Sequence, residues 1–265
     1  MKTYIGKKAL LVVSFGTSFG RTRAKTIDQI EKDLAEAFPD YQMYRAWTSK
    51  MIIAKILRRD GIKIPTVKEA VEQMLADGVS EILVQPTHLV NGIENDQMKE
   101  DIRSYESAFA SVSFGEPLLS STEDQEKAIQ AVMEEFTELT EEQALVFMGH
   151  GTTHYANSVY AALDYMMKDL GYSNAFLGTV EAYPSLDTLM KKVGELRPGK
   201  VLLAPFMVVA GDHAIRDMSG EDEDSWRSRF EAAGFTVECV MKGLGEYPGI
   251  RKLYIEHAKA AESGL

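Results

Sequence analysis

The chain has 265 residues, of which 45% are hydrophobic and 26% are charged, a composition typical of a folded globular protein. Its formal net charge of −11 argues against a protein that binds nucleic acid through a broad basic face. The sequence shows no apolar run long enough for a signal peptide or a membrane span, and Cys239 is the only cysteine. We therefore expect a cytoplasmic protein with no membrane or nucleic-acid partner, in which any metal is held by His, Asp and Glu.

Along the chain, short apolar runs alternate with amphipathic stretches of helical length. This alternation predicts an α/β fold in which parallel sheets are flanked by helices. The predicted strands are Ala9–Ser14, Gln42–Arg45, Glu81–Gln85, Val112–Phe114, Ala144–Gly149, Ala175–Val180, Lys200–Ala204 and Thr236–Cys239. The predicted helices are Thr22–Phe38, Thr66–Ala76, Asn95–Ser107, Glu123–Phe136, Asn157–Leu170, Leu186–Leu196, Asp224–Ala233 and Gly249–Lys259.

The two halves of the chain repeat one pattern. LVVSFGTS at 11–18 recurs as LVFMGHGTT at 145–153, and ILVQPTHLVNGIE at 82–94 recurs as VLLAPFMVVAGDH at 201–213. The repeats predict two similar α/β domains, residues 1–124 and 125–265, which face each other across a cleft. The last helix, 249–260, could pack on either domain.

Ligands of open parallel sheets bind beyond the carboxyl ends of the strands, and several polar residues fall at such ends. His150 follows an apolar strand between two glycines, His213 follows another, and Glu181 ends a third. Two histidines and a glutamate are a common ligand set for divalent metals of borderline softness. In the repeat, Glu94 falls opposite His213 and Phe15 falls opposite His150. Glu94 could also simply open the following helix, where a carboxylate suits the helix dipole.

Two of three further features allow a second, structural interpretation. His150 and His154 are four residues apart, but Gly151 argues against a helical zinc motif, so His154 is expected to line the cleft or begin the next helix. His88 lies beside the Asn-Gly turn before Glu94. The basic segment Arg45–Arg59, predicted to be largely helical, could be a solvated face or could receive substrate carboxylates.

The longest motifs closely resemble one enzyme family. They are KKALLVVSFGTS (7–18), VFMGHGTTH (146–154), TVEAYP (179–184) and MVVAGDHAIRD (207–217). They are similar to the anaerobic sirohydrochlorin cobaltochelatases of cobalamin biosynthesis, which are class II chelatases related in fold to ferrochelatases. The resemblance runs nearly end to end and implies that His150, Glu181 and His213 are the metal ligands.

The resemblance also implies a reaction, the insertion of Co²⁺ into sirohydrochlorin. Co²⁺ is then a substrate, Fe²⁺, Ni²⁺ or Zn²⁺ could replace it in vitro, and no organic cofactor is expected. Neutral imidazole can bind a divalent ion and accept a proton near neutral pH, so His150 and His213 are expected to take up the pyrrole protons, with Glu94 as an assisting base. The expected substrate contacts are Phe15, Arg45, His88 and His154.

Three alternatives remain open from the sequence. The first is a ferrochelatase that acts on sirohydrochlorin or a porphyrin, because metal choice at such a site follows availability as much as affinity. The second is a carrier that binds a tetrapyrrole or metal without catalysis. The third is an α/β protein with a structural zinc, although histidines flanked by glycines argue against a closed zinc site. Whether the chain forms a homo-oligomer is also open.

Overall fold

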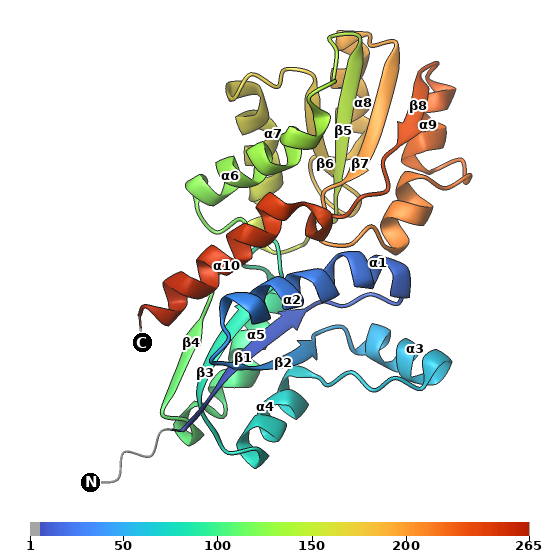
Figure 1. Cartoon of the computed structure of the whole chain (residues 1–265). Coiled ribbons are helices and arrows are strands. Elements are labelled where there is room, and N and C mark those ends of the chain that lie inside the picture. Colours follow the sequence, from blue (N-terminus) through green and yellow to red (C-terminus); the bar gives the residue numbers. More distant parts are fainter. Residues whose placement is uncertain (1–5, 265) are drawn as a thin grey trace. The chain divides into compact units, whose positions relative to one another are not determined.

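The computed structural model describes residues 6–264 and divides the chain into two compact units. The first unit consists of Met1–Ser120 together with Arg251–Leu265, and the second is Ser121–Ile250. Each unit contains a four-stranded parallel sheet flanked by helices (Figure 1), which confirms the α/β class predicted from the sequence. The last helix therefore lies, for most of its length, in the first unit.

The first unit has the strand order β2-β1-β3-β4, and all pairs are parallel. Parallel strands need crossover connections, and helices provide them here. The strands are β1 (Lys7–Ser14), β2 (Gln42–Trp47), β3 (Val79–Pro86) and β4 (Ser111–Phe114). The helices are α1 (Gly20–Lys25), α2 (Ile27–Ala37), α3 (Lys50–Asp60), α4 (Val67–Ala76), α5 (Ile93–Arg103) and α10 (Pro248–Glu262).

Both faces of the first sheet are buried, which explains the near-continuous apolar run of β1. Leu11 and Val13 face a core to which α4 and α5 contribute Val71 and Met98. On the other side of the sheet, α2 buries an apolar stripe that includes Ile30, and α10 lies beside it in Figure 1.

The second unit has the strand order β6-β5-β7-β8, again all parallel. Its strands are β5 (Gln143–Gly149), β6 (Ala175–Thr179), β7 (Lys200–Pro205) and β8 (Thr236–Cys239). Its α-helices are α6 (Thr122–Met133), α7 (Ser158–Asp169), α8 (Leu186–Leu196) and α9 (Trp226–Ala232). One 3₁₀ turn, η3 (Tyr155–Asn157), precedes α7, and one π-helical turn, η4 (Ala214–Met218), follows β7.

The two sheets have the same strand order, which confirms that the sequence repeat reflects a structural repeat. In each unit the repeated proline ends the third strand and pairs with the central strand, Pro86 with Val13 and Pro205 with Met148. Phe15 and His150 therefore occupy equivalent positions, each directly after the central strand of its sheet.

Two helical predictions differ from the structure. The single helix expected over 22–38 is two helices, because the backbone of Thr26 leaves the helical region and its hydroxyl donates to the carbonyl of Thr22 at 2.7 Å. The helical part of the basic segment begins at Lys50 and not at Arg45, because Trp47 continues the buried strand β2 and Ser49 caps the helix.

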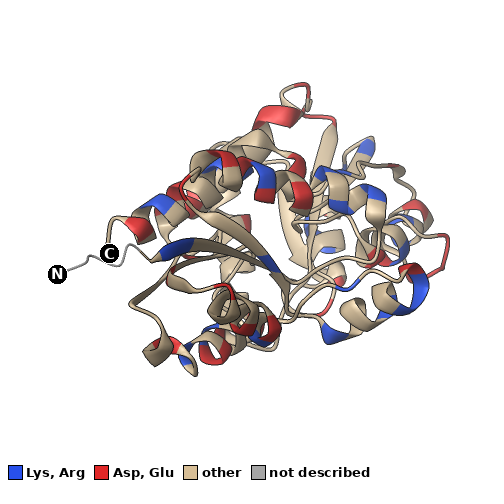
Figure 2. Cartoon of the chain, turned by 60° about the horizontal axis from the view of Figure 1, so that its bottom comes forward, with Lys and Arg blue, Asp and Glu red and all other residues tan. Residues whose placement is uncertain are grey.

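Charged residues lie mainly on the helices and loops, whereas most strand residues are uncharged (Figure 2). This pattern is expected when the sheets are buried between helices. Among residues 6–264, no helix is both long and apolar enough to cross a membrane.

Candidate metal centre

Three predicted ligands come together in the second unit. One ligand atom each of His150, Glu181 and His213 can be chosen so that all three lie within 4.8 Å of one another. The rings of His150 and His213 meet edge to face, with their centroids 4.7 Å apart. A Glu181 carboxylate oxygen lies 3.8 Å from Nδ1 of His150. Two nitrogen donors and one oxygen donor at this spacing could hold a divalent metal of the late first-row series.

His150 is presented by the end of β5. It follows Gly149, the last residue of that strand, and its Nδ1 lies 2.8 Å from the carbonyl oxygen of Gly151. If Nδ1 carries the proton and donates to this carbonyl, Nε2 is left with a free lone pair. The His150 side chain is 43% exposed, which is compatible with access of a metal to the ring.

His213 lies just before η4, and its ring is oriented by a carboxylate. Its Nδ1 is 2.6 Å from Oδ2 of Asp217, which is one turn further along the chain. A carboxylate on one ring nitrogen fixes the tautomer and makes the other nitrogen a better metal ligand. Asp212, the other carboxylate beside His213 in the sequence, instead forms an ion pair with Arg216.

Glu181 follows β6, and a backbone hydrogen bond places it beside His150. Its N–H donates to the carbonyl of His150 at 3.0 Å, which continues the pairing of β5 with β6. The Glu181 side chain is 54% exposed, so its carboxylate is free to reach a metal.

His154 was predicted either to line the cleft or to begin the next helix. In the structure it lies at the start of the next helical segment. Its Nδ1 accepts a hydrogen bond from the N–H of Ala156, so the ring caps η3, and it lies against the ring of Tyr155 with centroids 4.0 Å apart. Its expected contact with a substrate stays a prediction.

The remaining predicted site residues lie in the first unit. Phe15 follows β1 and is 44% exposed, which is unusual for a phenylalanine and compatible with the expected packing on an apolar ligand. Glu94 is exposed in the first turn of α5. A carboxylate at this position also suits the helix dipole, which is the alternative role considered for it. Their roles in the reaction stay predictions.

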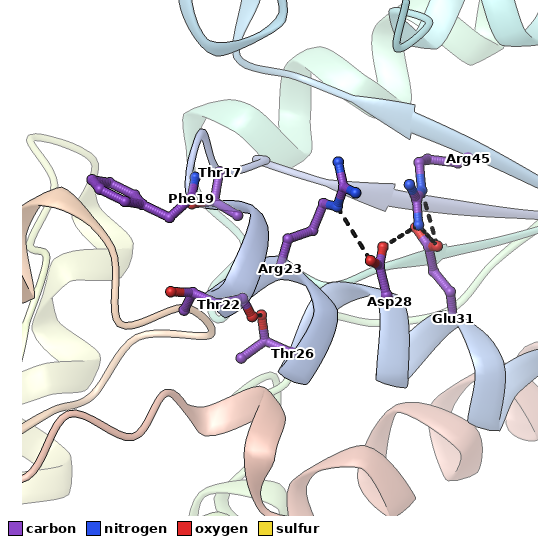
Figure 3. A network of polar contacts seen from close by, with 8 residues as sticks. All are labelled: Thr17, Phe19, Thr22, Arg23, Thr26, Asp28, Glu31 and Arg45. Atoms are coloured by element: carbon purple, nitrogen blue, oxygen red, sulfur yellow. Dashed lines mark hydrogen bonds and ion pairs between the residues drawn. The ribbon is translucent and has the colours of Figure 1, made fainter. Parts of the chain in front are cut away.

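Arg45 is engaged by carboxylates of its own unit (Figure 3). Its Nε donates to both carboxylate oxygens of Glu31, at 2.7 and 2.9 Å, and its Nη2 also contacts Asp28. Arg23 donates to the same Asp28 at 3.2 Å. The Glu31 side chain is only 3% exposed, and burial raises its pKa although Arg45 acts in the opposite direction. The charge of Arg45 is thus already matched, which makes it a poor receptor for a substrate carboxylate.

His88 follows β3, and both of its ring nitrogens are buried. Burial lowers its pKa to about 4, although neighbouring Asn95 and Glu94 act in the opposite direction. The ring is therefore neutral at neutral pH and offers no exposed nitrogen to a substrate.

This pKa predicts how stability depends on pH. Between the ordinary pKa of about 6.5 and about 4, the unfolded chain binds a proton at His88 that the folded chain does not, so folding becomes less favourable as the pH falls. We expect the free energy of unfolding to fall by an amount on the order of 3 kcal/mol between these two pH values, because one pKa unit corresponds to about 1.4 kcal/mol. Urea unfolding of the wild type and of His88→Gln at several pH values measures it. If the free energies of unfolding of the two proteins differ by the same amount at every pH, this expectation is contradicted.

Sequence reasoning missed one polar residue of this region. Asn157 bridges the segments that follow β5 and β6, through hydrogen bonds to Thr152 and Tyr183. Nothing in the sequence marks it, because an Asn at the start of a predicted helix is the residue expected of an ordinary N-cap.

Comparison with known proteins supports a chelatase. The family model described as "Cobalt chelatase (CbiK)" matches residues 8–263. The chain is 42% identical over 255 residues to the sirohydrochlorin cobaltochelatase of Salmonella typhimurium, covering 96% of each chain. It is 30% identical over 262 residues to the sirohydrochlorin cobaltochelatase CbiKC of Nitratidesulfovibrio vulgaris, covering 98% of this chain and 92% of the relative.

A solved structure supports the fold. SirB from Bacillus subtilis, determined with Fe³⁺, superposes with a TM-score of 0.67 at 13% sequence identity, covering 97% of each chain. At this identity the likeness concerns the fold alone.

Proposed function

Because the chain belongs to the cobalt chelatase (CbiK) family, we propose that it inserts cobalt(II) into sirohydrochlorin as a step of cobalamin biosynthesis. The observation that carries this proposal is the cluster of His150, Glu181 and His213, which provides an open set of donors within one unit of a chain whose curated relatives are sirohydrochlorin cobaltochelatases. An open set suits a metal that must be released, whereas a structural site would surround it.

In this proposal Co²⁺ is a substrate held by Nε2 of both histidines and by the Glu181 carboxylate. Nδ1 of each histidine faces a backbone carbonyl or a carboxylate, which supports metal binding through Nε2. As the pyrrole nitrogens replace these donors, two pyrrole protons must leave the macrocycle. His150 and His213, released from the metal, are the proposed acceptors, because imidazole accepts protons near neutral pH. Glu94 stays the predicted assisting base.

The carboxylates of the substrate need cations, and α3 offers them. Lys50, Lys55 and Arg58 are exposed on this helix, and no ion pair is recorded for them among residues 6–264. Arg59 donates to the carbonyl of Ser18 at 2.7 Å, so the end of α3 adjoins the segment that follows Phe15. We therefore place the carboxylate receptors on α3 and not at Arg45, which lies in a strand.

A spectroscopic assay tests the function. Sirohydrochlorin, kept anaerobic, is mixed with Co²⁺ and catalytic amounts of protein, and the absorbance change of metallation is followed against a control without protein. We expect several turnovers per protein molecule at a rate above the control. Stoichiometric binding without acceleration would instead indicate a carrier. The same assay with Fe²⁺ tests the iron alternative, and faster turnover with Fe²⁺ at equal metal concentration would favour it.

We further propose that the protein accepts Fe²⁺, Ni²⁺ or Zn²⁺ in vitro and needs no organic cofactor. A cytoplasmic location and self-association are also proposed.

A further inference from the structure

The segments that carry His150 and Glu181 are held together by backbone pairing only at their beginnings. Val180 donates to the carbonyl of Gly149 and Glu181 to that of His150, each at 3.0 Å. The next residue, Gly151, has a φ of +87°, and a Cβ there would come within 2.9 Å of the Cβ of Ala182. The two segments are therefore in close contact up to Gly151 and Ala182, and glycine is required at this approach.

Beyond that contact, the side chain of Asn157 connects the two segments. Oδ1 of Asn157 accepts from the N–H of Thr152 at 3.0 Å, and its Nδ2 donates to the carbonyl of Tyr183 at 2.7 Å. These partners fix the orientation of the amide, because a backbone N–H needs an acceptor and a carbonyl needs a donor. Asn157 therefore bridges the residue two positions after His150 and the residue two positions after Glu181.

Asn157 lies at the start of a helix that is packed against β5. It ends η3 and directly precedes α7, but its side chain does not cap that helix. In the first turns of α7, Tyr160 is buried, and its ring lies so close to Gly149 that a Cβ there would be 2.6 Å from the ring. The amide thus ties the start of α7 to both ligand-bearing segments.

We propose that Asn157 is a positioning residue for the metal centre, which sets the separation of His150 and Glu181 before Co²⁺ arrives. The inference rests on the proposed function, because it takes these two residues as metal ligands. Donors held at the required spacing bind without first being ordered, so removal of the bridge weakens metal binding. Partners that orient metal ligands typically contribute about 10- to 100-fold to metal affinity.

The test uses the full chain and Co²⁺ alone, with affinity measured by competition against a chromophoric chelator. Asn157→Ala removes both hydrogen bonds. Asn157→Asp keeps an acceptor for Thr152 but places an oxygen against the carbonyl of Tyr183. We expect both variants to bind Co²⁺ at least about 10-fold more weakly than the wild type, and to show a raised KM for cobalt in the insertion assay.

Asn174→Ala is the matched control. Asn174 also bridges loops of this unit, since its Nδ2 donates to the carbonyls of Thr140 and Gln143, each at 2.9 Å, but it lies before β6 and not after it. We expect it to lower thermal stability about as much as Asn157→Ala without changing the affinity for Co²⁺. If Asn157→Ala and Asn174→Ala weaken binding equally, or if either Asn157 variant binds like the wild type, the inference is overturned.

His150→Ala in the same titration separates the two hypotheses. If His150→Ala loses Co²⁺ binding while the Asn157 variants keep it, the positioning role fails and the metal site stands. If His150→Ala binds Co²⁺ like the wild type, the proposed metal site itself fails, and the positioning role fails with it.

Discussion

Replacing His150 or His213 with alanine is expected to lower the rate of cobalt insertion into sirohydrochlorin by at least about 100-fold while the fold is retained. Each variant removes one of two nitrogen donors from a three-residue cluster and also removes a proposed proton acceptor. Both side chains are partly exposed, so their loss leaves no large cavity in the core. The measurement is the anaerobic absorbance assay, accompanied by circular dichroism and thermal unfolding.

His257→Ala is the control for the loss of an imidazole. This histidine lies on α10, where Nδ1 is 2.9 Å from the carbonyl oxygen of Glu116, and it has no proposed part in the reaction. We expect its turnover to stay close to that of the wild type. Near-normal turnover in both His150→Ala and His213→Ala would rule out the proposed metal centre.

Arg45→Met is expected to lower the free energy of unfolding by about 3 kcal/mol, because it leaves the buried carboxylate of Glu31 without its partner. Breaking one side of a buried ion pair is far more costly than replacing the whole pair by apolar residues. Glu31→Leu combined with Arg45→Met should therefore recover much of the loss. Urea unfolding of the two single variants and the double variant measures this coupling.

Two comparisons make this prediction specific. Arg227→Met breaks an exposed ion pair with Glu231 on α9 and should change stability little. At a temperature where Arg45→Met is folded, its KM for sirohydrochlorin should match the wild type, whereas Lys55→Glu with Arg58→Glu on α3 should raise it. A raised KM for sirohydrochlorin in Arg45→Met, with unchanged stability, would instead indicate that Arg45 contacts the substrate.

The sequence predicted those features of the fold that depend on local patterns. Alternating apolar and amphipathic stretches located all eight strands found among residues 6–264. The repeated motifs predicted two similar domains, and the structure adds that their sheets share one strand order. The ends of the helices were predicted less well. Thr26 is compatible with a helix interior, and only its backbone geometry shows that one helix ends there and the next begins. Ser49 is of a residue type that favours helix N-caps, and the hydrogen bond that it accepts from Ile52 places the start of α3.

For the site, the sequence identified residues but not their partners. Glycines around His150 and the position of His213 after a strand marked both as candidate ligands. Arg45 looked available because Glu31, its main partner, is 14 residues away on another element, and nothing local shows that the two side chains meet. Asn157 was missed for the same reason, since its partner Tyr183 lies 26 residues further along the chain.

The course of α10 has a consequence for how the chain folds as it is synthesised. The second unit is continuous in sequence, but the first is completed only by residues from Arg251 onward. Within it, Tyr254 is buried and donates to the carbonyl of Thr87 at 2.8 Å, and Arg251 pairs with Asp33. Domains generally fold as units during translation, N-terminal ones first. Here the N-terminal unit is completed only once α10 has been synthesised, so the second unit can finish folding while the first still lacks that helix.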